Sequence, residues 1–161
     1  YGDEFPLPER ITPKLGARVM SLQDPTSKMS KSDENTGAFV LLTDEPDAIR
    51  RKIKSAVTDS ERQVSFDWSK KPGISNLLEL FSYFSSKSIG ELVDEYRDAG
   101  YGTFKEAVAE AVVEGLTPIR TAFKRLEDEE VSRIMQRGAL DARQRAEQSM
   151  SSVRASVGLT I

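Results

Sequence analysis

Apolar residues recur at intervals of three and four positions through most of the chain after residue 44. This spacing keeps side chains on one face of an α-helix, so it predicts amphipathic helices that pack their apolar faces together. The stripes run through Ile49, Ile53 and Val57; Leu77, Leu78, Phe81 and Phe84; Ile89, Leu92, Val93 and Tyr96; Phe104, Val108, Val112, Leu116, Ile119, Phe123 and Leu126; and Val131, Ile134, Met135, Ala142, Ala146, Met150 and Val153. The chain is therefore expected to be mainly α.

Capping and breaking residues predict where these helices begin. Ser88 and Thr103 each stand three positions before a Glu, which is the form of a capping box, so each is expected to open a helix. Pro118 falls inside the fourth stripe, where its missing N–H is expected to kink the helix or to restart it with Thr117 as the cap.

The first part of the chain has a different character. Residues 1–16 are rich in proline and predict an extended connector. Residues 18–22 predict a short strand and residues 39–42 predict a second short extended piece, and a polar segment rich in Lys and Ser separates them.

The residue types present limit the possible chemistry. The 161 residues include no Cys and no His, which excludes disulfides, thiol nucleophiles, cysteine zinc sites and Ser-His-Asp catalysis. A net charge of −3 argues against a uniformly basic nucleic-acid binder but allows a local basic face. No apolar run approaches the roughly 20 residues that span a bilayer, and no signal peptide opens the chain, so a cytoplasmic protein without membrane contact is expected.

The most distinctive segment is TSKMSKSD, residues 26–33. Its two ammonium groups, Lys28 and Lys31, alternate with hydroxyl and backbone N–H groups, a combination that suits a polyphosphate. Such groups stabilise the charge that develops on leaving pyrophosphate, and they need no proton transfer. The segment is not a P-loop, because the Gly-x4-Gly-Lys pattern is absent. A solvated surface loop is the alternative interpretation.

Within that segment, KMSKS at residues 28–32, here called the signature loop, resembles the second signature of class I aminoacyl-tRNA synthetases. Four flanking blocks make the resemblance more specific, and they are GARVMSL at 16–22, DPT at 24–26, KIKSAVTD at 52–59 and PGISNLL at 72–78. Together they are similar to the tryptophanyl-tRNA synthetases of bacteria, a family of ATP-dependent ligases in protein biosynthesis. A tyrosyl-type synthetase and a non-catalytic helical module that binds RNA or protein are the alternatives.

The resemblance implies roles for the polar residues of the signature loop. The loop would close over the triphosphate of ATP during activation of the amino acid. Lys31 would be the chief transition-state cation and Lys28 its ground-state companion, while Ser30 and Ser32 would supply hydroxyl contacts.

It also implies roles for two apolar residues and a counter-ion. Val19 matches the position whose backbone meets the adenine, and Met29 would anchor the loop close to the base. Mg²⁺ would accompany ATP as its counter-ion, and no metal site of the protein itself is expected.

The same resemblance implies a division of the chain at residue 43. Residues 1–43 would form the end of a nucleotide-binding, Rossmann-like catalytic fold, with its last strand and the signature loop. Residues 44–161 would form a C-terminal helical domain that reaches toward the tRNA anticodon. The basic residues between 50 and 71 are candidates for contact with tRNA, and the four favoured are Arg50, Arg51, Lys52 and Lys54. A solvated helix face is the alternative interpretation of these charges.

One part of such an enzyme is missing from the sequence. The first signature of class I synthetases contains His, and this chain has none. Because the chain also starts at Tyr1 without Met, we expect it to be part of a longer protein that holds most of the tryptophan pocket. The longer protein would be a homodimer that acts on ATP, tryptophan and tRNA(Trp). The isolated chain is expected to be a monomer that neither activates tryptophan nor charges tRNA.

Overall fold

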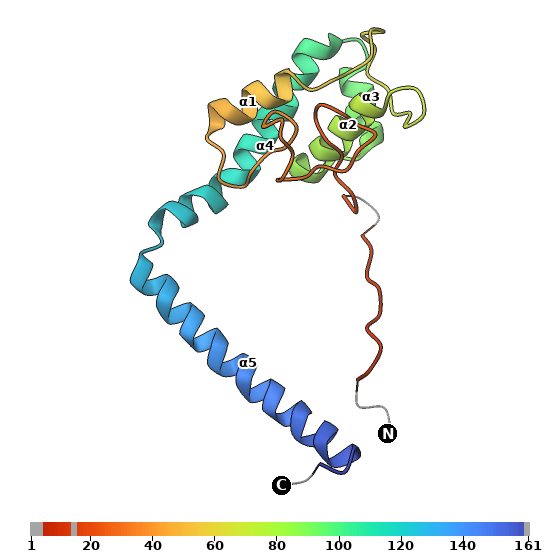
Figure 1. Cartoon of the computed structure of the whole chain (residues 1–161). Coiled ribbons are helices and arrows are strands. Elements are labelled where there is room, and N and C mark those ends of the chain that lie inside the picture. The colour runs from red at the N-terminus through yellow and green to blue at the C-terminus, as the bar shows by residue number, and fades with distance from the viewer. Residues whose placement is uncertain (1–4, 14–15, 160–161) are drawn as a thin grey trace. The chain divides into compact units, whose positions relative to one another are not determined.

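A computed structural model describes residues 5–13 and 16–159, in which five α-helices follow one another along the chain (Figure 1). They are α1 (Pro46–Lys54), α2 (Pro72–Ser85), α3 (Ile89–Tyr96), α4 (Gly100–Arg125) and α5 (Asp128–Ser156). In the described ranges, β-pairing is limited to one isolated antiparallel bridge between Met20 and Lys28. The prediction of a mainly α chain is confirmed.

The chain divides into two compact units. One unit is Thr12–Lys124, and the other combines Tyr1–Ile11 with Arg125–Ile161. The division predicted at residue 43 concerns the catalytic fold of a longer protein and stays a prediction.

Most of the core of the Thr12–Lys124 unit comes from the first four predicted apolar stripes, although their members Val57, Ile119 and Phe123 are exposed. Fully buried side chains come from all four of its helices and from two loops, and they include Leu22, Ile49, Ile53, Val64, Ile74, Leu77, Leu78, Leu92, Phe104 and Val108. Three aromatic rings link α2, α3 and α4, since the rings of Phe81, Tyr96 and Phe104 have centroids 5.5–6.2 Å apart. This core supports the segment that precedes the signature loop.

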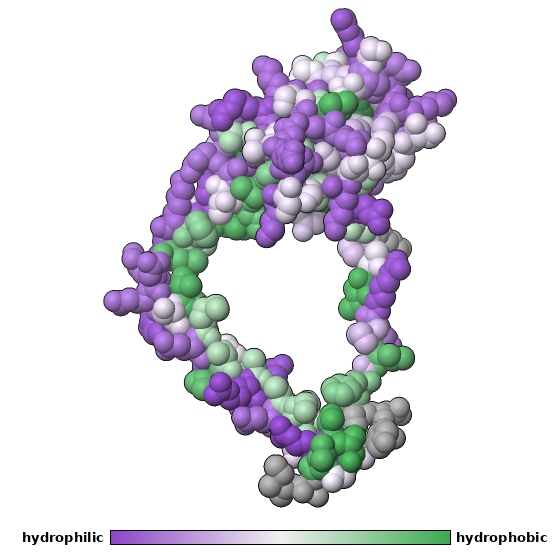
Figure 2. Space-filling view, viewed as in Figure 1, coloured by the Kyte–Doolittle hydropathy of each residue, from purple (hydrophilic) through white to green (hydrophobic). Residues whose placement is uncertain are grey.

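Helix α5 has no buried residue, and apolar side chains reach the surface along it (Figure 2). Exposed examples are Val131, Ile134, Met135 and Leu140. Although α5 has 29 residues, neither it nor any other helix in the described part of the chain is apolar enough to cross a membrane.

The structure confirms one predicted capping box and corrects the other. Ser88 caps α3: its hydroxyl accepts from the Glu91 N–H, and the Glu91 carboxylate accepts from the Ser88 N–H. The prediction that Thr103 caps a helix is wrong, because α4 already begins at Gly100. Gly100 has a φ of +77°, which a glycine adopts without strain, so the chain enters α4 three residues before the predicted cap.

Helix α4 also continues through Pro118 without a restart. Thr117 is therefore not a cap, and its hydroxyl donates instead to the Val113 carbonyl one turn earlier, at 2.6 Å. The run at residues 18–22, predicted as a strand, is likewise reduced to an extended segment. A strand needs a partner along its length, and residues 18–22 obtain their hydrogen bonds from several separate loops and one side chain.

Candidate functional site

The signature loop begins on a short antiparallel pairing. The Ser21 N–H donates to the Ser27 carbonyl at 2.9 Å, and the Met29 N–H donates to the Val19 carbonyl at 3.0 Å. These two bonds flank the Met20–Lys28 bridge and fix which residues face one another. The positions of Lys28 and of the residues after it therefore depend on the path of residues 19–21.

The turn before the loop is fixed by Asp24. Its carboxylate accepts hydrogen bonds from the Ser27 hydroxyl at 2.6 Å, from the Thr26 hydroxyl at 2.6 Å and from the Thr26 N–H at 3.1 Å. Those bonds, that of Ser27 first, lower the pKa of the Asp24 carboxyl. In the sequence, residues 24–26 served only as one of the four flanking blocks, and the role of the Asp24 carboxylate in organising the base of the loop was missed.

The two lysines of the signature loop are available to an anion. Both side chains are exposed, and among the described residues no carboxylate lies within ion-pair distance of either ammonium group. The Ser30 hydroxyl accepts from the Ser32 N–H at 3.3 Å, and the Ser30 carbonyl accepts from the Asp33 N–H at 3.2 Å. The loop thus combines an internal turn with two uncompensated positive charges.

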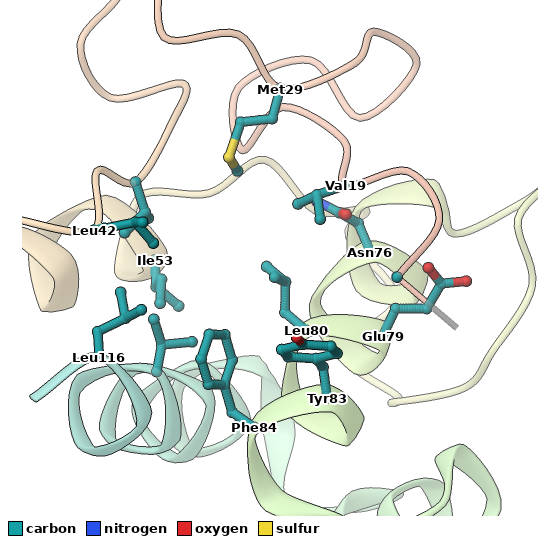
Figure 3. A pocket seen from close by; sticks show the side chains of 13 residues that line it. Val19, Met29, Leu42, Ile53, Asn76, Glu79, Leu80, Tyr83, Phe84 and Leu116 are labelled. Carbon is teal, nitrogen blue, oxygen red and sulfur yellow. The ribbon is translucent and has the colours of Figure 1, made fainter. Parts of the chain in front are cut away.

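Val19 and Met29 line one apolar hollow of about 330 Å³, and the Met29 side chain points into it (Figure 3). The opposite wall is made by side chains of α2 and α4, among them Leu80, Tyr83, Phe84 and Leu116. The structure therefore brings together the two residues that the sequence predicted near the adenine. Asn76 and Glu79 also line this hollow and contribute polar groups to it.

The four basic residues of α1 fall into two groups. Arg50 is engaged by acidic residues: its guanidinium donates to both carboxylate oxygens of Glu110, at 2.7 and 2.9 Å, and to Asp47 at 3.0 Å. These bonds, those with Glu110 first, raise the pKa of Arg50. Lys52 is also engaged, because its ammonium lies 2.6 Å from the Asp44 carboxylate and 5.1 Å from the centre of the Phe39 ring.

Arg51 and Lys54 remain exposed, and neither forms an ion pair with any residue that the structure describes. Of the four candidates, only these two present uncompensated charge to a phosphate backbone.

No cluster of three or more acidic side chains that could hold a metal ion occurs within residues 5–13 and 16–159.

Comparison with known proteins decides which family has this arrangement. The family model described as tRNA synthetases class I (W and Y) matches residues 1–117. The chain belongs to this family. The resemblance inferred from the signature loop and its flanking blocks is thereby confirmed.

Individual members agree with the family model. The chain is 48% identical over 160 residues to the tryptophan–tRNA ligase of Bacillus subtilis, covering 99% of this chain and 48% of that protein. It is 44% identical over 161 residues to the same-named protein of Caldanaerobacter subterraneus, covering 100% of this chain and 49% of that protein. The chain spans about half the length of these relatives.

A solved structure shares the fold. The crystal structure of tryptophanyl-tRNA synthetase from Mycoplasma pneumoniae superposes with a TM-score of 0.78 at 28% identity, covering 92% of this chain and 45% of that one. The arrangement of the helices in this chain is therefore shared with a solved tryptophanyl-tRNA synthetase.

Proposed function

We propose that this chain supplies the triphosphate-closing loop and the tRNA-reaching helices of an ATP-dependent tryptophan–tRNA ligase. The observation that supports this most directly is the pair Lys28 and Lys31, exposed and without a carboxylate partner among the described residues, on a loop with the family's signature. The names of the relatives give the amino acid and the tRNA.

In the proposed reaction the tryptophan carboxylate attacks the α-phosphorus of ATP, forming tryptophanyl adenylate and releasing pyrophosphate. Negative charge grows on the leaving pyrophosphate, and Lys31 is proposed to stabilise it most strongly in the transition state. Lys28 is proposed to hold the triphosphate in the ground state as well, with Ser30 and Ser32 donating hydroxyl hydrogen bonds. None of these steps requires a proton to be moved by His, which this chain lacks.

The hollow under the loop supports the proposed contact with the base. Val19 and Met29 present apolar surface there, and the backbone of Val19 is already ordered by its bond to Met29. Mg²⁺ is proposed only as a counter-ion of the nucleotide. The donors of the signature loop are ammonium and hydroxyl groups, which suit phosphate oxygens, whereas Mg²⁺ prefers carboxylates and water.

Contact with tRNA(Trp) is proposed for α1. Arg51 and Lys54 are the better candidates, because Arg50 and Lys52 are already neutralised by carboxylates of this chain. A phosphate that approached Arg50 would have to displace two acidic side chains.

The proposal assigns the rest of the active site to a longer cytoplasmic, homodimeric protein. The 161-residue chain alone is proposed to activate no tryptophan and to charge no tRNA. Tryptophan-dependent pyrophosphate exchange by the isolated chain would contradict this.

The decisive experiment is pyrophosphate exchange by a full-length protein that contains this chain. Lys31→Ala should raise the activation barrier by about 2–4 kcal/mol, as expected when a group aimed at developing charge is lost. Lys70→Ala, which removes an exposed lysine outside the loop, is the matched control. An unchanged rate in Lys31→Ala would reject the assignment. Exchange that depends on tyrosine would identify a tyrosyl-type enzyme, and no exchange at all would favour a binding module.

A further inference from the structure

Asn76 is a buried polar residue of α2, with 2% of its surface exposed. Its carboxamide bonds to both backbone groups of one distant residue: the amide nitrogen donates to the Met20 carbonyl at 2.9 Å, and the side-chain oxygen accepts from the Met20 N–H at 3.0 Å. One donor and one acceptor are what the backbone of a neighbouring strand offers an extended residue. The Asn76 side chain therefore occupies the place of a strand next to Met20.

The surrounding hydrogen bonds show what this contact stabilises. Successive residues of an extended segment direct their backbone groups to opposite edges. On one edge, Val19 and Ser21 bond to the residues that flank Lys28, as described above. On the other edge, the Leu22 N–H donates to the Ala38 carbonyl at 2.9 Å, and the Leu22 carbonyl accepts from the Val57 N–H at 2.7 Å. At Met20, the backbone N–H and carbonyl on this second edge form their hydrogen bonds with the Asn76 side chain.

We infer that Asn76 is a positioning residue for the signature loop: through Met20 it fixes the extended segment against which Lys28 and the loop residues pair. The inference rests on the proposed function of the loop. An Asn inside a helix has low intrinsic propensity and loses hydration when it is buried, so the two bonds to Met20 explain its burial at this position. Without them, the N–H and carbonyl of Met20 lose their hydrogen-bond partners. The segment that pairs with residues 27–29 is then no longer held on its opposite edge at Met20.

The first test measures amide hydrogen exchange in the 161-residue chain. In Asn76→Ala, the amides of Ser21 and Met29, which report the pairing, should lose at least tenfold in protection relative to a core amide such as that of Val112. The matched control is Ser82→Ala, which removes another buried α2 hydrogen bond, to the Lys87 carbonyl at 2.6 Å, far along the helix from Asn76. In that control, the protection of the Ser21 and Met29 amides relative to the Val112 amide should not change.

A second variant keeps the test decisive if Asn76→Ala does not fold. Asn76→Asp has nearly the same shape and, at a pH where its carboxyl is ionised, retains an acceptor for the Met20 N–H but loses the donor to the Met20 carbonyl. The Met20 amide should stay protected, while the Ser21 and Met29 amides lose part of their protection. Unchanged protection of Ser21 and Met29 in both variants would overturn the inference.

The second test uses pyrophosphate exchange by a full-length protein that contains this chain. Asn76→Ala should lower kcat at least tenfold and leave the KM for tryptophan unchanged, whereas Ser82→Ala should change neither. Wild-type kcat in Asn76→Ala would overturn the positioning role. If the loop amides lose protection but Lys31→Ala exchanges pyrophosphate at the wild-type rate, then the proposed function fails and the structural link from Asn76 to the loop is supported.

Discussion

The ammonium group of Lys71 lies 3.0 Å from a carboxylate oxygen of Asp59, with 7% of the Lys71 side chain and 21% of the Asp59 side chain exposed. Tyr101 donates its hydroxyl hydrogen to the same oxygen at 2.6 Å, and the exposed Glu61 lies 2.8 Å from the ammonium. The cluster joins the segment after α1 to the first residues of α4. The sequence predicted that Lys71 belongs to a basic surface that contacts tRNA. In the structure Lys71 is buried and forms ion pairs with Asp59 and Glu61.

Replacing Lys71 should destabilise the fold. Lys71→Met leaves the Asp59 carboxylate partly buried without its cation, and we expect a loss of about 2–3 kcal/mol in the free energy of unfolding, measured with urea. Lys70→Met is the control, because the neighbouring side chain is exposed and should change stability by less than about 0.5 kcal/mol. Equal effects of the two substitutions would show that the cluster contributes nothing specific.

The same cluster predicts an acid-sensitive component of stability. Burial raises the pKa of Asp59, but hydrogen bonds from Tyr101, the Glu61 N–H and Lys71 outweigh it, so the pKa lies below its ordinary value of 3.8. A lowered pKa in the folded state stabilises the fold above the unfolded-state value, and this contribution is lost as the pH falls through the folded-state value. Urea unfolding below pH 3.8 should therefore show a steeper loss in the wild type than in Asp59→Asn. Parallel profiles would contradict the assignment.

Gly73 should be intolerant of a side chain. A Cβ at this position would lie well inside van der Waals contact with the Val57 carbonyl oxygen, which belongs to the backbone and cannot rotate away. We expect Gly73→Ala to cost at least about 2 kcal/mol of stability. Gly90→Ala in α3 is the matched control, because no atom lies near its added methyl group and alanine favours the helix by about 0.5–1 kcal/mol. A stabilised Gly73→Ala would refute the close approach.

Lys28 and Lys31 should differ in their kinetic effects. If Lys28 contributes to ground-state binding, Lys28→Ala in a full-length protein should raise the KM for ATP more than it lowers kcat. Lys31→Ala should mainly lower kcat if, as proposed, its interaction with the triphosphate strengthens in the transition state. Steady-state pyrophosphate exchange at varied ATP separates the two patterns, and identical patterns would mean that the roles are not divided.

Substitutions of the basic residues of α1 should differ in their effect on the affinity for tRNA(Trp) and on its salt dependence. Arg51→Ala and Lys54→Ala should each weaken binding and reduce the slope of log K against log salt by about 0.7–0.9 if each residue contacts one phosphate. Arg50→Ala should leave that slope nearly unchanged, because Glu110 and Asp47 already compensate its charge. Filter binding at several salt concentrations tests this, and a larger slope change for Arg50 would reverse the assignment.

Local patterns were sufficient for much of the fold. The apolar spacing predicted the helices, and the Ser88 capping box is as expected because both partners lie within four residues of each other. The start of α4 was misplaced because the positive φ of Gly100 depends on how the chain leaves α3, not on a motif at Thr103. The strand predicted at residues 18–22 was not formed for a similar reason, since one partner of Met20 is a side chain 56 positions away.

Patterns within short stretches of the chain were sufficient to predict its helical character, its family and the residue types of the signature loop, because each depends on residues that are neighbours along the chain. Which cations are left without a carboxylate partner depends instead on the folded arrangement. Arg50 is compensated by Glu110, 60 positions away, and Lys71 by Asp59, 12 positions away, while Lys28 and Lys31 have no such partner among the described residues. A charge is neutralised by whatever carboxylate lies within a few ångströms, and folding, not sequence order, sets that distance.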